Sequence, residues 1–289
     1  MLPNPIFTVF GQGVYMYGVC IAVGLIACIA VFYIYTARKG MPTKLQDFIF
    51  FLVIAAIAIG FLFAKLYQTV YDWIETGRFD FYGSGMTVMG GLIGGAAVFL
   101  IGYFLIGKFY FKGKDKNMHI KYFNIPLLVA PLCITIAHAF GRLGCLMSGC
   151  CHGAYLGKDY VFGGIWMHAP DTGNVGFHVP TQLYEALFLF ALFAVMSILY
   201  FKNFNFTMHL YLVAYGVWRI FIEFFRTDAR GAIVLGLAPS QWQSFLFIAG
   251  GVALIVLWLI KKIPFRLKPD ALSATKPRLK EKKEVKEEQ

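Results

Sequence analysis

Long runs of apolar residues dominate the chain and alternate with short polar segments. Seven of these runs are long enough, or nearly so, to cross a bilayer as helices of about 20 residues. They cover residues 14–36, 48–64, 86–107, 122–141, 186–201, 205–222 and 240–260. The fifth run becomes a full span if residues 182–185 form its first turn, and the sixth contains one charge, Arg219. The pattern predicts an all-α polytopic membrane protein with seven transmembrane helices.

The composition supports this class. Of the 289 residues, 59% are apolar and only 14% are charged, with a mean hydropathy of +0.66. An average soluble domain is about 45–50% apolar and about 25% charged. A soluble enzyme or a disordered chain is therefore excluded. The first apolar run has no Lys or Arg before it and is too long for a signal peptide, so we expect it to remain as an anchor.

Most basic residues lie in alternate loops, which would all be on one side of the membrane. Three follow the first span, five follow the third, one follows the fifth, and ten lie in the tail at 261–289. The other side holds Lys65, Arg78, Arg142, Lys158, Arg219, Arg226 and Arg230. Because basic loops stay in the cytoplasm, the N-terminus is predicted outside and the C-terminus inside. The net charge of +11 then reports orientation and contact with an anionic leaflet, and it does not indicate nucleic-acid binding.

Two domains follow from these patterns. Residues 1–260 form the seven-helix transmembrane domain. The tail at 261–289 has mixed charge and few apolar residues, so we expect a disordered cytoplasmic extension.

Unusual polar residues and glycines gather on the side that carries few basic residues. Four segments bring them there, at residues 83–95, 141–153, 178–185 and 215–226. An ionisable group within a span is unfavourable unless it faces a polar interior. The sequence therefore predicts a polar site at the depth of the outer leaflet.

Arginines make this site a candidate for binding an anion. Arg219 and Glu223 are four residues apart and share a helix face, so they form either a structural ion pair or part of an anion site. Arg142 lies between two glycines, which allow close approach of a ligand. Guanidinium groups bind phosphate bidentately, so a phospholipid headgroup is the expected ligand. Gly90 and Gly91 serve either close helix packing or space for acyl chains.

The cysteines allow several interpretations. Cys145, Cys150 and Cys151 lie close together in the sequence, beside His152. Their spacing lacks the second CxxC or HxxxH of a zinc site, so no metal is predicted. Nor is there a phosphate loop, and we expect no cofactor. Cys145 and Cys150 either pack as thiols, form a disulfide in an oxidising compartment, or belong to a membrane thiol oxidoreductase.

Several motifs together resemble the prolipoprotein diacylglyceryl transferase family. They are YMYG at 15–18, GMTVMGGLIGG at 85–95, GRLGCLMSGCCHG at 141–153, HVPTQLYEA at 178–186, YGVWRIFIEFFR at 215–226 and SQWQS at 240–244. The resemblance implies a seven-helix enzyme of the bacterial inner membrane. Such an enzyme moves the diacylglyceryl group of phosphatidylglycerol to the lipobox cysteine of a prolipoprotein and releases glycerol 1-phosphate.

The resemblance also implies roles for particular residues. By motif position, Arg142 binds the lipid phosphate and Arg219 is the second essential arginine. Other functional positions of the family fall on Tyr17, Gly153, Tyr215 and Glu223. On the same side we expect Arg226, His178, Gly90 and Gly91 to contact substrate. The expected partners are phosphatidylglycerol, the lipobox segment and membrane lipids.

Three positions depart from the usual family pattern. Met89 replaces a histidine, Cys145 replaces an asparagine, and Lys65 replaces an arginine. If that histidine is a general base, another group must take its place here, and Tyr215, His178 and His152 are candidates. The departures also leave open a lipid-binding paralogue with an altered donor, an altered acceptor or no activity.

Overall fold

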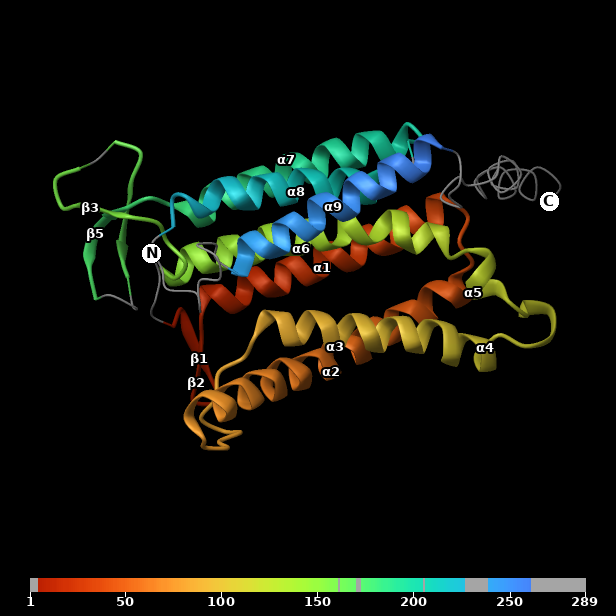
Figure 1. The fold of residues 1–289 in the computed structure, drawn as a ribbon, viewed down its shortest axis with the longest axis horizontal. Coiled ribbons are helices and arrows are strands. Elements are labelled where there is room, and N and C mark those ends of the chain that lie inside the picture. Colours follow the sequence, from red (N-terminus) through yellow and green to blue (C-terminus); the bar gives the residue numbers. More distant parts are fainter. Residues whose placement is uncertain (1–4, 161, 170–172, 205, 227–238, 261–289) are drawn as a thin grey trace, which may run out of the picture. The chain divides into compact units, whose positions relative to one another are not determined.

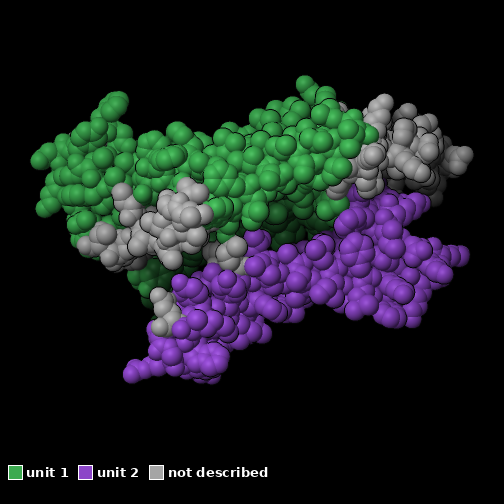
Figure 2. All heavy atoms as spheres, in the orientation of Figure 1, with its two compact units in different colours: residues 1–35, 126–273 green, residues 36–125, 274–289 purple. Residues whose placement is uncertain are grey.

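A computed structural model describes residues 5–260, apart from 161, 170–172, 205 and 227–238. The predicted tail and Arg230 therefore lie outside the described residues. The chain forms two compact units, coloured in Figure 2. Unit 1 contains residues 1–35 and 126–273, and unit 2 contains residues 36–125 and 274–289.

Unit 1 is a helical bundle. It contains α1 (Met16–Arg38) as far as Tyr35, α6 (Asn124–Ser148) from Pro126, α7 (Thr181–Phe201), α8 (Thr207–Glu223) and α9 (Pro239–Leu259). Successive helices run in opposite directions, so α6 and α8 end where α1, α7 and α9 begin (Figure 1). Polar side chains also join the helices, since the Tyr200 hydroxyl donates to the Tyr35 carbonyl at 2.7 Å and the Thr207 hydroxyl donates to the Leu128 carbonyl at 2.6 Å.

Two small sheets lie at the end of unit 1 where α6 finishes (Figure 1). One is the antiparallel hairpin of β1 (Phe7–Val9) and β2 (Gln12–Val14). The other has the antiparallel order β3–β5–β4, from β3 (Tyr155–Gly157), β5 (Val175–His178) and β4 (Ile165–His168). These strands were not predicted from the sequence, because three or four residues are too few for a clear alternating pattern.

Unit 2 is built on an antiparallel pair of helices, α2 (Thr43–Thr76) and α3 (Val88–Ile101). After α3 come a π-helical turn at Gly102–Ile106, α4 (Gly107–Tyr110), a 3₁₀ turn at Gly113–Asp115 and α5 (Met118–Lys121). Glycines allow the two long helices to pack closely, because a Cβ on Gly60 would lie 3.1 Å from the Gly91 carbonyl oxygen. A Cβ on Gly90 would lie 2.5 Å from the Cβ of Tyr67.

The described helices agree in part with the seven predicted spans. Six are long and apolar enough to cross a membrane: Met16–Arg38, Thr43–Ile74, Gly90–Tyr110, Asn124–Ser148, Thr181–Phe201 and Ser240–Leu257. The predicted sixth span corresponds to α8, which has 17 residues and a length of about 25 Å at 1.5 Å per residue. The predicted bounds of the second span were too short, because α2 continues through a polar segment to Thr76 and stops before Gly77, whose φ is +72°.

Apolar side chains cover the outer surfaces of these helices. Phe51, Leu187, Val217 and Leu246 are all more than half exposed. Such large apolar surfaces are unfavourable in water and match the hydrocarbon of a bilayer. The fold is therefore that of an all-α, multi-pass membrane protein.

Candidate functional site

Three helices of unit 1 contribute a buried cluster of charged side chains. The carboxylate of Glu185, in the first turns of α7, lies at its centre and is completely buried. Its Oε2 lies 3.0 Å from Nε of Arg142 on α6 and 3.9 Å from a terminal nitrogen of Arg226. Its Oε1 accepts a hydrogen bond of 3.2 Å from the Tyr215 hydroxyl on α8.

Arg142 is held at one edge of its guanidinium group. Its Nε donates to Nε2 of His138 at 3.2 Å and also faces Glu185. His138 is four residues earlier on α6, so both side chains leave the same face of that helix. Neither contact uses the two terminal amino groups of the guanidinium, which form the fork that binds phosphate bidentately.

A stripe of polar residues on α8 completes the cluster. Tyr215, Arg219 and Glu223 recur every four residues and therefore share one helix face. Arg219 lies 3.1 Å from Glu223, which confirms the predicted ion pair. One turn earlier on α8, the ring of Tyr211 stacks on the ring of Tyr215, with centroids 5.6 Å apart. We call Arg142, Glu185, Arg219, Glu223 and Arg226 the arginine cluster.

The charges of the arginine cluster do not cancel. Three arginines face two carboxylates, so the described cluster carries one net positive charge when His138 is neutral. All five side chains are at least 86% buried, since the largest exposed fraction is the 14% of Arg142. Removing one member of a buried ion pair costs about 3–5 kcal/mol. Three guanidinium groups therefore lie together in a buried site, an arrangement suited to an anion such as a phosphate.

A tight turn brings Gly153 beside this cluster. Gly153 forms a bridge with Arg226 and donates from its amide to the Val179 carbonyl at 2.9 Å. A Cβ on Gly153 would lie 2.4 Å from the backbone oxygen of Phe225. Only glycine allows the chain to pass here, and the passage keeps Arg226 close to the start of α7.

The two histidines proposed as general bases lie side by side in the structure. His178 is fully buried at the end of β5, and its Nδ1 lies 3.1 Å from the Gly176 carbonyl oxygen. The rings of His152 and His178 meet edge to face with centroids 4.5 Å apart. The third candidate base, Tyr215, contacts Glu185 directly.

Tyr17, Gly90 and Gly91, the other residues predicted for the site, pack against neighbouring helices. The Tyr17 ring packs on α6, because a Cβ on Gly144 would lie 3.1 Å from its Cδ2. In unit 2, Gly90 and Gly91 face α2, where the predicted close packing is confirmed. A role of these glycines in substrate binding stays a prediction.

Sequence reasoning missed two residues that organise the site, Glu185 and His138. The sequence did contain a feature that could have identified each of them. Glu185 is an acidic residue at the start of a long apolar run, and His138 lies four residues before Arg142 within another. Both are ionisable groups in predicted spans, which mark functional interiors.

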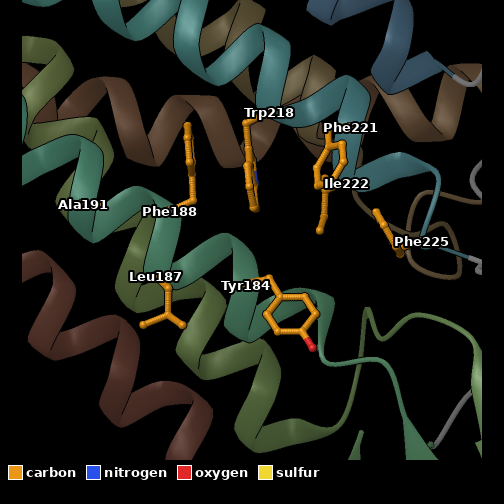
Figure 3. Close-up of a pocket in the computed structure, with 8 residues that line it drawn as sticks. All are labelled: Tyr184, Leu187, Phe188, Ala191, Trp218, Phe221, Ile222 and Phe225. Atoms are coloured by element: carbon orange, nitrogen blue, oxygen red, sulfur yellow. The ribbon is translucent and has the colours of Figure 1, made fainter. Parts of the chain in front are cut away.

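An apolar groove lies between α7 and α8, as Figure 3 shows. Its volume is about 540 Å³. The side chains that line it include Tyr184, Leu187, Phe188, Trp218, Phe221 and Phe225. Phe188 and Trp218 stack in parallel, with centroids 4.3 Å apart. Tyr184 and Phe225 are next to Glu185 and Arg226 in the chain, so the groove and the arginine cluster draw on the same part of the chain.

The helices and the buried cluster define a multi-pass membrane protein with an arginine-rich polar site in its interior. The sequence profile of the prolipoprotein diacylglyceryl transferase family matches residues 5–257. The chain belongs to this family.

Named relatives agree with this assignment. The chain is 30% identical to phosphatidylglycerol–prolipoprotein diacylglyceryl transferase 2 of Clostridium perfringens over 268 residues, which cover 89% of this chain and 95% of the relative. It is also 30% identical to the phosphatidylglycerol–prolipoprotein diacylglyceryl transferase of Clostridium tetani, over 86% of this chain and 94% of that protein. The enzyme of the same name from Streptococcus pneumoniae is 29% identical over 86% of this chain and 91% of its own length.

Proposed function

We propose that this protein transfers the diacylglyceryl group of phosphatidylglycerol to the lipobox cysteine of prolipoproteins. A thioether bond forms between the cysteine sulfur and the glycerol carbon, and the carbon–oxygen bond to the phosphate breaks. Glycerol 1-phosphate leaves. The observation that carries the proposal is the arginine cluster, a buried positive site within a chain of this family.

The leaving phosphate needs positive charge that is already in place. Glu185 and His138 hold Nε of Arg142, which fixes the plane of the guanidinium group and directs its terminal nitrogens to the phosphate. Glu223 faces one terminal nitrogen of Arg219 at 3.1 Å and so holds this guanidinium group from another side. Donors fixed before the reaction stabilise developing negative charge without reorganisation, and removing one costs about 10²–10³ in rate.

The acceptor cysteine must lose its proton, because the thiolate is the nucleophile. We propose Tyr215 as the relay: its hydroxyl passes its own proton to Glu185 as it takes the proton of the acceptor thiol. Its hydroxyl donates to Glu185, so Glu185 is the acceptor that keeps the tyrosine oriented. The proposed proton relay therefore lies on α7 and α8. The position of the family's usual histidine lies in unit 2 and is Met89 in this chain.

The apolar groove is the proposed site of an acyl chain. Its lining includes the chain neighbours of Glu185 and Arg226, so we propose that a lipid whose phosphate meets the arginines lays a chain along α7 and α8. The aromatic pair of Phe188 and Trp218 gives the groove a flat wall.

We further propose seven spans, with α8 as the sixth, an external N-terminus and a cytoplasmic C-terminus. The support is the placement of basic residues and the alternating directions of the helices in unit 1 (Figure 1). The arginine cluster then faces the outer leaflet of the bacterial inner membrane. Residues 1–260 form the transferase domain and 261–289 the cytoplasmic tail.

Complementation tests the proposal in cells. A bacterial strain depleted of its own transferase is supplied with this chain, and one lipoprotein is examined by mass spectrometry. The expected result is restored growth with the mass of one diacylglyceryl group on the lipoprotein cysteine. Arg142→Ala and Arg219→Ala should abolish both. Failure of the unchanged chain, although it is inserted in the membrane, would instead indicate a paralogue with another donor or acceptor.

A further inference from the structure

Three thiols converge at the end of α6. The sulfur atoms of Cys145, Cys150 and Cys151 all lie within 4.8 Å of one another. We call these residues the thiol cluster. All six cysteines of the chain lie among the described residues, and all are free thiols. The spacing in the sequence argued against a metal site, but it did not show that the turn after α6 folds the later two cysteines back onto Cys145.

The backbone holds this arrangement firmly. After α6 ends at Ser148, the chain turns through Gly149 and Cys151, whose φ values are +77° and +62°. A left-handed conformation costs a residue other than glycine about 1–2 kcal/mol. The first turn of α7 stabilises the turn, because Gln182 donates to the Cys150 carbonyl at 2.6 Å and Thr181 donates to the Cys151 carbonyl at 2.9 Å.

The electrostatic surroundings favour a thiolate at Cys151. Cys151 lies beyond the membrane-spanning part of α6, and hydrogen bonds with the Cys145 and Cys150 thiols lower the pKa of its thiol. The positive charges of Arg226 and Arg142 lower this pKa further. A thiolate is the form that binds metal.

From this geometry we propose that the thiol cluster is a binding site for a thiophilic metal ion of the zinc and cadmium type. Zinc–sulfur bonds of about 2.3 Å in a tetrahedral site place sulfurs about 3.8 Å apart, so small side-chain rotations complete the site. Binding displaces the remaining thiol protons to solvent, and no electron transfer is involved. The ion would connect the last turn of α6 to the turn that α7 holds. Three protein thiolates leave a fourth coordination position for water.

Cadmium provides a direct test, since it gives a thiolate-to-metal charge-transfer absorption. The full chain in detergent is reduced, treated with a chelator, exchanged into buffer and titrated with Cd²⁺. We expect one equivalent to bind with this absorption. Cys145→Ser, Cys150→Ser and Cys151→Ser should each weaken binding by at least about tenfold, and the triple variant should lose the absorption.

A matched control uses the other three cysteines. Cys133 donates to the Cys28 carbonyl at 3.7 Å, and neither of these residues nor Cys20 belongs to a three-thiol group. The triple serine variant at these positions should bind Cd²⁺ as the unchanged chain does. Mass spectrometry after alkylation should show that Zn²⁺ protects the thiol cluster and leaves Cys20 reactive.

Two results would overturn the inference. One is equal cadmium binding by the unchanged chain and the thiol-cluster triple variant. The other is that the reduced chain binds no Cd²⁺, although a separate alkylation without metal modifies all three thiols and so shows that they are reduced and accessible. Thermal unfolding of each variant without metal checks that it is folded, and the single variants keep the test decisive if the triple variant is not. Neither assay depends on the transferase reaction.

Discussion

The buried contact between Glu185 and Arg142 allows a quantitative test of how the site is organised. Glu185→Gln keeps the size of the side chain but removes its charge. At 3.0 Å and an effective dielectric constant of about 20, two unit charges attract by about 5.5 kcal/mol, before the cost of desolvation is subtracted. Breaking one side of a buried pair costs about 3–5 kcal/mol. We therefore expect Glu185→Gln to destabilise the protein by about 3 kcal/mol.

A double-mutant cycle separates the interaction energy of Glu185 and Arg142 from the other effects of each substitution on stability. Arg142→Gln alone leaves Glu185 near Arg226, which lies 3.9 Å away, so part of the charge remains compensated. In the double variant neither charge of the pair remains. Its loss of stability should then be smaller than the sum of the single losses by at least about 1 kcal/mol.

Stability is measured by denaturant-induced unfolding of the purified protein in detergent, with tryptophan fluorescence as the signal. The rate of lipidation of a lipobox peptide is measured on the same samples. Glu185→Gln should lower this rate as well, because Arg142 loses the partner that orients it. Additive losses of stability, within about 0.5 kcal/mol, would refute the claim that Glu185 holds Arg142 in place.

Four further predictions follow from single contacts. Arg219→Lys keeps the charge but loses the fork, so the rate at saturating lipid should fall by about 10²-fold; an unchanged rate would exclude a bidentate role. Gly153→Ala should destabilise the protein and reduce activity because its Cβ would meet the Phe225 oxygen, whereas Gly250→Ala, with no atom within 4 Å, should have little effect on unfolding. Trp218→Ala should raise KM for long-chain phosphatidylglycerol more than for a short-chain analogue, and an equal rise for both would argue against the groove. Alkylation of Cys151 should stay fast below pH 8, where an ordinary thiol slows about tenfold per pH unit, because its lowered pKa keeps the thiolate populated.

The helical class could be predicted well from the sequence, because an apolar run of about 20 residues is rarely anything except a membrane-spanning helix. Helix ends were less predictable. Hydropathy ended the second span at Ala64, but helical hydrogen bonding continues to Thr76 and stops only where Gly77 adopts a left-handed conformation. Hydropathy reports which residues suit lipid, whereas a helix ends where backbone hydrogen bonds end.

The arginines of the site and the partner Glu223 could be predicted, but the partner Glu185 could not. Arg219 and Glu223 lie on one helix, so their spacing was sufficient to predict the pair. Glu185 contacts residues from α6 and α8, and no spacing within α7 reveals such contacts. The thiol cluster could not be predicted for the same reason, since its geometry depends on a turn that is held by hydrogen bonds from α7.

Reconstitution tests the central claim most directly. The purified chain is placed in vesicles that contain phosphatidylglycerol, with a lipobox peptide as acceptor, and matched vesicles contain phosphatidylethanolamine in its place. The account predicts that the peptide gains the mass of one diacylglyceryl group, with release of glycerol 1-phosphate, only when phosphatidylglycerol and Arg142 are both present. Equal product from Arg142→Ala, shown to be folded by its unfolding curve, would contradict it.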